Sequence, residues 1–274
     1  MKNIKILVTG ATGFVGQIFS DKISKEYTNI EVVRIGFSRK KEGVISADLS
    51  QLDETKRLIE SVKPTHVFHF AAMVNPKLNE ENKSESYRKN FIITNNLVAA
   101  CSQNTTIYFL STDKVYDSSN KNALELDVTK IPDNFYSLMK IICENIISSK
   151  FSKHFILRCP IIHSLGDTNS NSFIDGALIK LTLNEKINVF DNIVRHYILI
   201  DELIKFLIDL LFSDKYGTYN VGTFPMSYYE RIFSLANSKG LNTSLISTSK
   251  GNVLPETQTY SLTKLHSTFN KIFK

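Results

Sequence analysis

Short apolar segments alternate with segments of helical spacing through the first 158 residues. The apolar segments are typical of strands buried on both faces; they are residues 4–9, 30–36, 66–71, 106–111 and 154–158. The segments between them carry apolar residues three and four apart, as helices do; they are residues 14–24, 51–62, 85–103 and 136–149. This alternation predicts an α/β fold of the Rossmann type, a doubly wound parallel sheet with helices on both faces.

The pattern changes after Pro160. Short segments separated by Gly166, Gly176 and Gly217 replace the regular alternation. A strongly apolar helix near residues 201–212 has the character of a segment that returns to the main sheet. The sequence therefore predicts a first domain over residues 1–158, with a return segment at about 196–216. Residues 159–195 and 217–274 are expected to form a smaller, discontinuous α/β domain.

Composition supports a folded chain. The protein has 274 residues, of which 42% are hydrophobic and 22% charged, and this length suffices for a proper core. No run of about 18 apolar residues occurs, so no membrane span is expected. The first residues, MKNIKILVTG, lead directly into a strand and are too short an apolar stretch for a signal peptide.

Charge and metal-ligand patterns exclude several function classes. The net charge is +6, but the lysines are scattered and tryptophan is absent, which favours a soluble protein with anionic ligands over a nucleic-acid-binding protein. Cys101, Cys143 and Cys159 are an odd number without CxxC spacing, so we expect reduced thiols and a cytoplasmic location. The six histidines show no HxxxH or HExxH pattern, and no metal site is expected.

The loop after the first strand has the spacing of a phosphate-binding turn. Residues 9–16 read TGATGFVG, with Gly10, Gly13 and Gly16 between a strand and a helix. Gly10 would allow the tight turn, Gly13 would let the backbone approach a pyrophosphate, and Gly16 would let the helix pack closely. The helix N-terminus offers free N–H groups and a partial positive charge to phosphates. A dinucleotide site is predicted here in preference to a structural turn.

The end of the second strand bears on the choice of cofactor. An acidic residue there would bind the adenosine ribose, but the chain reads Gly36-Phe37-Ser38-Arg39-Lys40. Ser38 and Arg39 could hold a 2′-phosphate, because a guanidinium suits phosphate geometry. The alternative is an ordinary exposed basic turn. We expect NADP(H) to be preferred, with NAD(H) also able to bind.

A tyrosine and a lysine form the candidate catalytic pair. Tyr136 and Lys140 have the i, i+4 spacing that places both on one face of a helix. An ammonium near a phenol lowers the pKa of the tyrosine, which suits Tyr136 to donate or accept a proton at a carbonyl. Ser111 and Thr112 end the preceding strand, and ligands meet a parallel sheet at that end of its strands.

The ordered set of motifs resembles the extended short-chain dehydrogenase/reductase family, of the NAD-dependent epimerase/dehydratase type. TGATGFVG resembles the family's cofactor loop, and Tyr136 with Lys140 matches its catalytic pair. Further matching segments cover the chain to about residue 240: Asp48-Leu49, Phe70-Ala71-Ala72, NFIITNNL from Asn90, STDKVYD from Ser111, ILRCPIIHSLG over 156–166, RHYILID over 195–201 and GTYNVG over 217–222. Within the family, STDKVYD and the short chain most resemble the dTDP-4-dehydrorhamnose reductases.

The resemblance implies roles for individual residues. Tyr136 would donate a proton, and Lys140 would bind the nicotinamide ribose and tune Tyr136. Thr112 and Ser111 would hydrogen-bond the substrate carbonyl. The cofactor would contact Gly10, Thr12, Gly13, Phe14, Val15, Gly16, Ser38, Arg39, Asp48, Leu49, Ala71, Ala72, Asn90, Tyr136, Lys140, Cys159 and Ile161. The substrate would contact Met73, Thr112, Asp113, His163 and Arg195.

Two of these assignments have structural alternatives. His163 could donate to the substrate or make a structural hydrogen bond in its loop. Arg195 could bind the diphosphate of a nucleotide sugar or form a surface salt bridge. The resemblance also implies that the first domain binds the dinucleotide, that the second binds the substrate, and that two copies form a homodimer.

The expected function is NADP-dependent reduction of a keto-sugar nucleotide of the 4-keto-6-deoxy type. Lys114 stands where the family's 4,6-dehydratases have a glutamate, so the base for water elimination is missing. Residues 74–77, Val-Asn-Pro-Lys, lack the acidic residues that rhamnose-type reductases place there, which leaves the sugar open. The alternatives are a nucleotide-sugar epimerase of the same family and a regulatory, cofactor-binding subunit without turnover.

Overall fold

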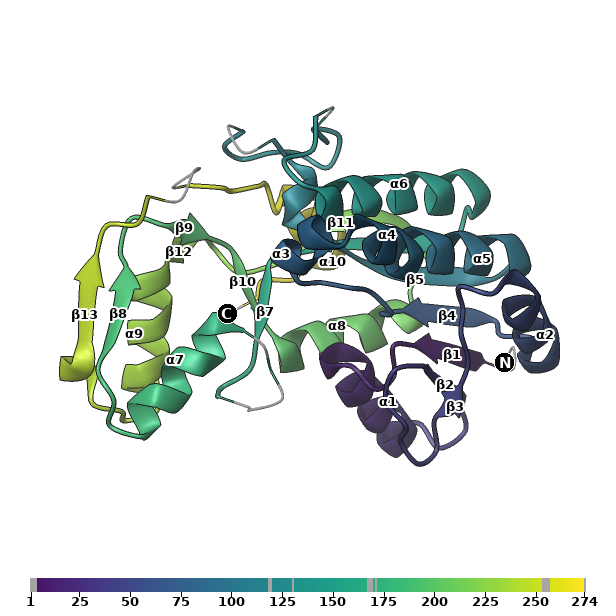
Figure 1. Cartoon of the computed structure of the whole chain (residues 1–274), viewed down its shortest axis with the longest axis horizontal. Coiled ribbons are helices and arrows are strands. Elements are labelled where there is room, and N and C mark those ends of the chain that lie inside the picture. Colours follow the sequence, from purple (N-terminus) through teal and green to yellow (C-terminus); the bar gives the residue numbers. More distant parts are fainter. Residues whose placement is uncertain are drawn as a thin grey trace. The chain divides into compact units, whose positions relative to one another are not determined.

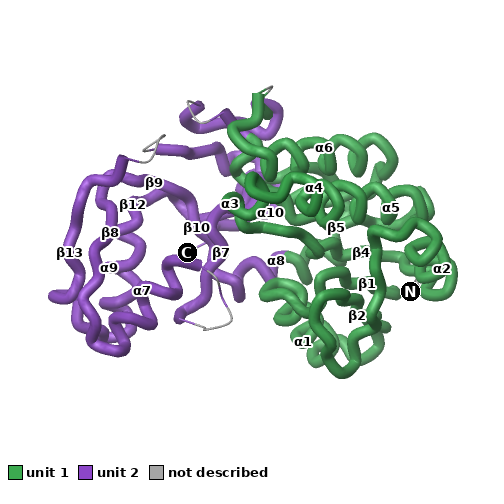
Figure 2. Tube along the Cα trace, in the orientation of Figure 1, with its two compact units in different colours: residues 1–115, 128–158, 207–219 green, residues 116–127, 159–206, 220–274 purple. Residues whose placement is uncertain are grey.

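The structure, a computed structural model, describes residues 4–117, 120–129, 131–166, 170, 172–252 and 257–273. The chain divides into two compact units, which Figure 2 distinguishes by colour. Unit 1 comprises Met1–Val115, Val128–Arg158 and Leu207–Tyr219, and unit 2 comprises Tyr116–Asp127, Cys159–Phe206 and Asn220–Lys274. The return segment of unit 1 thus starts later than residue 196, and residues 116–127 join unit 2.

Unit 1 is built on a seven-stranded sheet (Figure 1). The strand order is β11-β6-β5-β4-β1-β2-β3, and β1 pairs in parallel with both β2 and β4. The strands are β1 (Lys5–Thr9), β2 (Glu31–Gly36), β3 (Ile45–Ser46), β4 (His66–His69), β5 (Thr106–Thr112), β6 (His154–Cys159) and β11 (Gly217–Asn220). This order confirms the predicted doubly wound Rossmann-type fold, in which ligands meet the carboxyl ends of the strands where the order reverses, between β1 and β4.

Helices cover both faces of this sheet. In Figure 1, α5 and α6 lie on one face and α1 on the other, and α2 packs against α5. The helical elements are α1 (Phe14–Glu26), α2 (Leu52–Val62), α3 (Pro76–Glu81), α4 (Lys83–Ser86), a π-helix (Tyr87–Ile92), α5 (Ile93–Ala100), a 3₁₀ turn (Asp113–Val115), α6 (Phe135–Lys150) and the residues of α8 (Ile200–Leu211) from Leu207 onward.

Alternate residues of the strands supply the core on each face. Val67 and Ile107 belong to the apolar cluster shared with α2, α5 and α6. The next residues point to the opposite face, where the Phe68 and Tyr108 rings stack with centroids 3.9 Å apart. Phe19 of α1 lies 4.2 Å from the Phe68 ring. Because both faces are buried, the strands appear in the sequence as continuous apolar runs.

Unit 2 contains small sheets and two longer helices, α7 (Phe173–Thr182) and α9 (Tyr228–Ser238). Its described strands pair β7 (Ile161–His163) with β10 (Tyr197–Leu199), β9 (Val194–Arg195) with β12 (Met226–Ser227), and β8 (Ile187–Phe190) with β13 (Ile246–Ser249). Buried residues of α7, α9 and β8 form one apolar cluster with Tyr197. Ser227 and Glu230 form a capping box that fixes the start of α9.

The C-terminal residues, which carry no sequence motif, are fixed by His196 and Asn220. The Tyr260 N–H donates to Nε2 of His196 at 3.1 Å, and the two rings stack at 3.9 Å. Asn220, in the GTYNVG motif, donates to the Ser261 carbonyl at 3.0 Å and accepts from the Tyr116 hydroxyl. Asn220 therefore connects the tail to Tyr116, more than 100 positions upstream of Asn220. The tail continues into α10 (Thr263–Phe269).

Some elements differ from the sequence predictions. The helix expected at 85–103 is interrupted by the π-helix and ends at Ala100, and α3 was not predicted. The Asn75 side chain caps α3 by accepting from the Leu78 N–H, and the Asn82 side chain caps α4 by accepting from the Glu85 N–H. These two caps start two short helices ahead of residue 85, where no helix was predicted.

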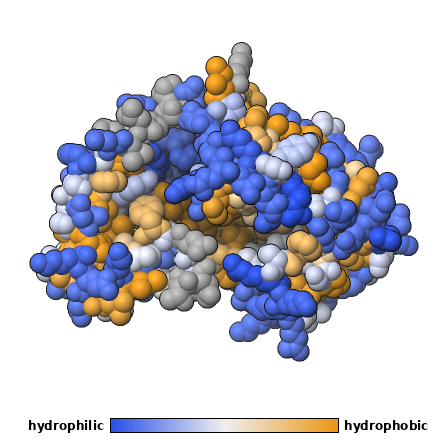
Figure 3. Space-filling view, viewed as in Figure 1, coloured by the Kyte–Doolittle hydropathy of each residue, from blue (hydrophilic) through white to orange (hydrophobic). Residues whose placement is uncertain are grey.

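The remaining features are membrane spans, metal ligands, thiols and the surface. No helix of the described residues is long and apolar enough to cross a membrane, and in that same part no group of three or more His, Cys, Asp or Glu could hold a metal ion. Cys101, Cys143 and Cys159 are free and buried, and burial raises the pKa of Cys101 to about 12. The face in Figure 3 is largely hydrophilic, with hydrophobic residues in separate patches.

Candidate functional site

The glycine loop between β1 and α1 packs tightly on backbone atoms. Gly10 has a φ of +66°, and a Cβ there would lie 2.6 Å from the Ala71 nitrogen. A Cβ on Gly16 would lie 2.3 Å from the Gly10 carbonyl oxygen. Gly13 is the N-cap of α1, and no side chain caps that end. The N–H groups of the first turn are therefore available to an anion.

The basic turn after β2 lies beside the glycine loop. Nη1 of Arg39 is 3.5 Å from the Thr12 carbonyl oxygen, and Ser38 and Arg39 are both exposed. Gly36 ends β2 at a point where a Cβ would lie 2.9 Å from the Thr12 side chain. The structure thus places an exposed guanidinium next to the loop that would hold phosphates.

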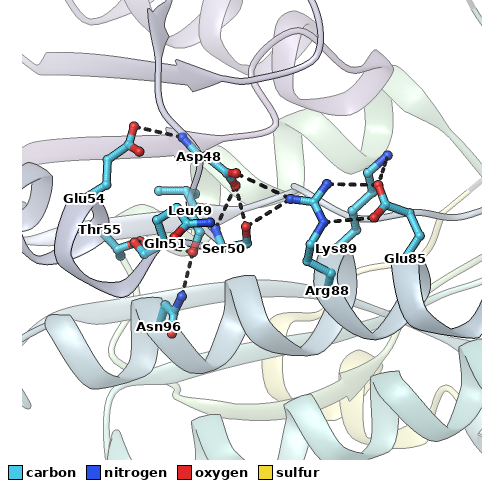
Figure 4. A network of polar contacts seen from close by, with 10 residues as sticks. All are labelled: Asp48, Leu49, Ser50, Gln51, Glu54, Thr55, Glu85, Arg88, Lys89 and Asn96. Carbon is cyan, nitrogen blue, oxygen red and sulfur yellow. Dashed lines mark hydrogen bonds and ion pairs between the residues drawn. The ribbon is translucent and has the colours of Figure 1, made fainter.

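Asp48 and Leu49 follow β3 and belong to the polar network of Figure 4. The Asp48 carboxylate accepts from the Ser50 N–H at 3.0 Å and from the Ser50 hydroxyl at 2.7 Å, and it lies 3.4 Å from the Arg88 guanidinium. Glu85 holds Arg88 through two hydrogen bonds of 2.9 Å. The network ties the loop after β3 to the π-helix, and Leu49 beside it is buried.

Asn90 in the π-helix holds the loop after β4, which contains Ala71, Ala72 and Met73. Oδ1 of Asn90 accepts from the Met73 N–H at 2.8 Å, and Nδ2 donates to Oδ1 of Asn79 at 2.8 Å. The buried Asn90 side chain thus shapes this loop through protein contacts, and its contact with the cofactor stays a prediction. Asn79 was missed by sequence reasoning, since an asparagine outside any motif carries no signal.

Tyr136 and Lys140 lie on the buried face of α6, which packs against β5. The Asn134 side chain caps the start of this helix. Nζ of Lys140 is 5.8 Å from the centroid of the Tyr136 ring and donates to the Leu110 carbonyl at 2.7 Å. Tyr136 is 8% exposed and Lys140 4%. The pair is therefore adjacent, as the helical spacing indicates, and anchored next to the end of β5.

Glu144, one turn further along α6, is the hydrogen-bond partner of Ser111. The Ser111 hydroxyl donates to the Glu144 carboxylate, and Arg158 of β6 binds the same carboxylate at 2.6 Å. All three side chains are buried. A serine hydroxyl has one proton, and here that proton is directed at Glu144; the contact of Ser111 with a substrate carbonyl stays a prediction. Extending the i, i+4 series from Lys140 would have pointed to Glu144.

Thr112 and Asp113 lie at the carboxyl end of β5. Oγ1 of Thr112 donates to Oδ1 of Asp113 at 3.2 Å and accepts from the Lys114 N–H at 3.3 Å. The first distance exceeds the usual range of about 2.5–3.0 Å for O–H···O bonds, and the second slightly exceeds the range of about 2.7–3.2 Å for N–H···O bonds. The Thr112 hydroxyl is thus held by two long hydrogen bonds at the end of β5.

His69 at the end of β4 is a buried residue that sequence reasoning missed. Its Nδ1 lies 2.7 Å from the Thr9 hydroxyl oxygen, and its Nε2 lies 2.9 Å from that of Thr94. Burial, and then the charge of Lys140, lower the pKa of His69 to about 3. The imidazole is therefore neutral at physiological pH and adds no positive charge beside Lys140.

Four of the predicted site residues belong to unit 2: Cys159, Ile161, His163 and Arg195. Nε2 of the fully buried His163 accepts from Nη2 of Arg231 at 2.8 Å, so Nδ1 donates to the Ser164 carbonyl at 2.7 Å. Burial also lowers the pKa of His163. Both ring nitrogens of His163 thus bond within the protein, which favours the structural hydrogen bond, and the contact with a substrate stays a prediction. Arg195 is 3% exposed, which excludes a surface salt bridge.

The sequence matches the NAD dependent epimerase/dehydratase family over residues 6–222. The chain belongs to this family. Its curated relatives include methionine adenosyltransferase 2 subunit beta of Pongo abelii, 27% identical over 164 residues, or 59% of this chain and 48% of that protein. A probable GDP-L-fucose synthase of Drosophila melanogaster is 31% identical over 144 residues, or 50% of this chain and 43% of that protein. The matched stretch is about half the length of these relatives.

Solved structures of the epimerase/dehydratase type share the fold of the whole chain. A dTDP-4-dehydrorhamnose reductase from Clostridium acetobutylicum has a TM-score of 0.82 at 22% identity, covering 97% of this chain and 92% of that one. The Bacillus anthracis dTDP-4-dehydrorhamnose reductase, in complex with NADP, has a TM-score of 0.83 at 16% identity, covering 99% and 95%. A Thermus thermophilus UDP-glucose 4-epimerase, in complex with NAD, has a TM-score of 0.78 at 21% identity, covering 96% and 92%.

Proposed function

We propose that the protein is an NADP-preferring oxidoreductase, able also to use NAD, that reduces the keto group of a 4-keto-6-deoxy-sugar nucleotide. The observation that carries the proposal is the placement of Tyr136 and Lys140 on the face of α6 that packs against β5, the strand that ends at Thr112. The glycine loop belongs to the same unit. A proton donor, its cationic neighbour and a dinucleotide loop are what carbonyl reduction requires.

A dinucleotide fits the residues around the glycine loop. Side chains at Gly10 or Gly16 would collide with backbone, so the loop is shaped for close approach of a phosphate, and the uncapped end of α1 would bind it. The exposed guanidinium of Arg39 supports binding of a 2′-phosphate. The other residues proposed to hold the cofactor are Thr12, Gly13, Phe14, Val15, Ser38, Asp48, Leu49, Ala71, Ala72, Cys159 and Ile161.

The chain's own residues handle the proton. When bound, NADPH supplies a hydride to the carbonyl carbon. Tyr136 donates its phenol proton to the carbonyl oxygen, and the Lys140 ammonium, 5.8 Å from the ring centroid, stabilises the phenolate left behind. Thr112 turns its hydroxyl from Asp113 to the same oxygen. Lys140 would also hold the cofactor through its ribose hydroxyls.

The proposed substrate is a nucleotide sugar. Met73 and Asp113 would contact the sugar, and the Arg195 guanidinium suits a diphosphate. Relatives and structural neighbours are named for GDP-L-fucose, dTDP-4-dehydrorhamnose and UDP-glucose, which supports this class. Lys114 would place an ammonium where elimination of water needs a base, so a dehydratase is not proposed. Epimerisation uses the same residues and is the alternative within the family; a homodimer is part of the proposal.

A second candidate function is that of a cofactor-binding subunit without turnover. The similarity over 59% of the chain to a protein named as a subunit, methionine adenosyltransferase 2 subunit beta, favours it. A pure binding module, however, has no chemical need for Ser111, Tyr136 and Lys140 together. This set therefore favours an enzyme.

The test supplies NADPH or NADH together with 4-keto-6-deoxy sugars linked to dTDP, UDP or GDP. Nicotinamide absorbance and the sugar products are followed together. The proposal predicts consumption of NADPH equal to the amount of reduced sugar formed. A changed sugar without net consumption of NADPH would indicate the epimerase, and cofactor binding with no change in any sugar would indicate the subunit.

A further inference from the structure

Glu144 is a buried carboxylate one helical turn beyond Lys140 on the same face of α6. Side chains four residues apart on a helix have Cβ atoms about 5–6 Å apart, so a lysine and a glutamate at this spacing can pair. Among the described residues, however, the hydrogen bonds to the Glu144 carboxylate come from Ser111 and Arg158. The carboxylate is therefore directed away from the lysine that the proposed mechanism uses.

Arg158 of β6 holds Glu144 in this position. Its Nε lies 3.1 Å from Oε1 and 3.2 Å from Oε2 of Glu144, and its Nη2 lies 2.6 Å from Oε2. The two side chains are only 4% and 7% exposed. A planar guanidinium that donates to both oxygens fixes the orientation of the carboxylate. Removing Arg158 alone would leave a buried carboxylate without this cation, with the ammonium of Lys140 one turn away.

Lys140 is oriented by uncharged groups of β5. Its Nζ donates to the Leu110 carbonyl at 2.7 Å and lies 4.4 Å from the centroid of the Phe109 ring. A carbonyl and an aromatic ring attract the ammonium without neutralising its charge. Ser111, the residue after Leu110, donates to Glu144. The same stretch of β5 therefore meets both side chains of α6 and keeps them on separate partners.

We propose that Arg158 is a positioning residue of the candidate site, which binds Glu144 and so keeps this carboxylate from pairing with Lys140. The proposal rests on the proposed function, which assigns the Lys140 ammonium to Tyr136 and to the cofactor ribose. Without Arg158, Glu144 would draw the ammonium from the Leu110 carbonyl, and its negative charge would oppose a phenolate at Tyr136. An amide at position 144 would not do so, although it could still accept the hydrogen bond from Ser111.

The experiment compares Arg158→Met with Glu144→Gln in NADPH titration and in turnover of a 4-keto-6-deoxy-sugar nucleotide. Each variant breaks the buried ion pair, so both should lose free energy of unfolding. Only Arg158→Met leaves a carboxylate beside Lys140. It should raise the Kd of NADPH and lower kcat by about tenfold, the loss expected for one charge-assisted hydrogen bond, with the KM of the sugar nearly unchanged. Glu144→Gln should keep all three values near those of the wild-type protein.

The double variant separates positioning from a structural role. Arg158→Met combined with Glu144→Gln removes the carboxylate together with its partner, so NADPH affinity and kcat should recover although the ion pair is absent. Arg158→Lys keeps a cation beside Glu144 and should also remain near wild type. Arg34→Met is the matched control, because it breaks another ion pair of 2.6 Å, to Asp21, and should change neither value. Arg158→Gln replaces Arg158→Met if the latter does not fold, as urea unfolding would show.

The possible outcomes distinguish this inference from the proposed function. Wild-type values in Arg158→Met, equal losses in Arg158→Met and Glu144→Gln, or a double variant no better than Arg158→Met would overturn the inference. NADPH titration decides this without turnover. A wild-type protein that binds NADPH but converts none of the sugars would refute the proposed function alone, whereas failure to bind NADPH would refute both.

Discussion

Replacing Gly16 by alanine tests whether close packing of the glycine loop creates the cofactor site. The new Cβ would lie 2.3 Å from the carbonyl oxygen and 2.9 Å from the carbonyl carbon of Gly10. Real Cβ atoms essentially never approach within 3.0 Å, so α1 and the loop must separate by at least about 0.7 Å. The obstacle is backbone, which cannot rotate away as a side chain could.

Helix propensity and packing change the free energy of unfolding of Gly16→Ala in opposite directions. Helix propensity alone would make Gly16→Ala stabilising by about 1 kcal/mol, whereas overpacking costs about 1–3 kcal/mol. Loss of one charge-assisted hydrogen bond to a phosphate costs about 1.5–3 kcal/mol, or about 10- to 150-fold in affinity. We therefore expect the Kd for NADPH to rise at least about tenfold, with no gain in the free energy of unfolding.

Gly176→Ala is the matched control for this prediction. Gly176 also lies within a helix, α7, but a Cβ there would meet nothing within 4 Å. This change should raise the free energy of unfolding by about 0.5–1 kcal/mol and leave NADPH binding unchanged. The assays are titration of nicotinamide fluorescence and unfolding in urea. If Gly16→Ala bound NADPH as tightly as the wild-type protein, the loop would not be the cofactor site.

Three further predictions follow from the same geometry. Arg39→Ala should weaken NADPH by about tenfold and leave NADH nearly unchanged, because only the 2′-phosphate needs the guanidinium; equal titration curves for both cofactors on the wild-type protein would contradict this. The pKa of His69 is lowered from 6.5 to about 3, so the folded protein should lose stability as the pH falls below about 6.5, by up to about 1.4 kcal/mol per pH unit. Between pH 6.5 and 4, the free energy of unfolding measured in urea should depend less steeply on pH in His69→Gln than in the wild-type protein, whereas His154→Gln should keep the wild-type slope. Lys140→Met should lower both kcat and the affinity for NADPH, since Lys140 is assigned to Tyr136 and to the ribose; a loss in only one of the two would show that one assignment is wrong.

The sheet of unit 1 could be predicted because its strands have a distinct pattern. The central strands are buried on both faces, as Phe68 and Val67 on β4 illustrate, and continuous apolar runs between amphipathic helices leave few other folds. The i, i+4 spacing of Tyr136 and Lys140 likewise places both side chains on one helix face, whatever the rest of the chain does. In both cases, the spacing of residues close together in the sequence determines the structural feature.

The hydrogen-bond partners of Ser111 and His163 could not be predicted because they are distant in the sequence. Ser111 meets Glu144, 33 residues away, and His163 meets Arg231, 68 residues away. A motif shows that a polar side chain is present but not which group forms a hydrogen bond with it. The same holds for Asn90, whose amide is used by Met73 and Asn79 in the loop after β4.

The central claim is that Tyr136 supplies the proton for reduction of a carbonyl. The decisive measurement compares wild-type protein and Tyr136→Phe for turnover of a 4-keto-6-deoxy-sugar nucleotide with NADPH, and for the Kd of NADPH. Phenylalanine keeps the buried ring and removes only the hydroxyl. Since general acid catalysis contributes about 10²–10⁴-fold, kcat should fall by that factor while the Kd stays within about twofold of wild type. Near-wild-type turnover by Tyr136→Phe would contradict the account.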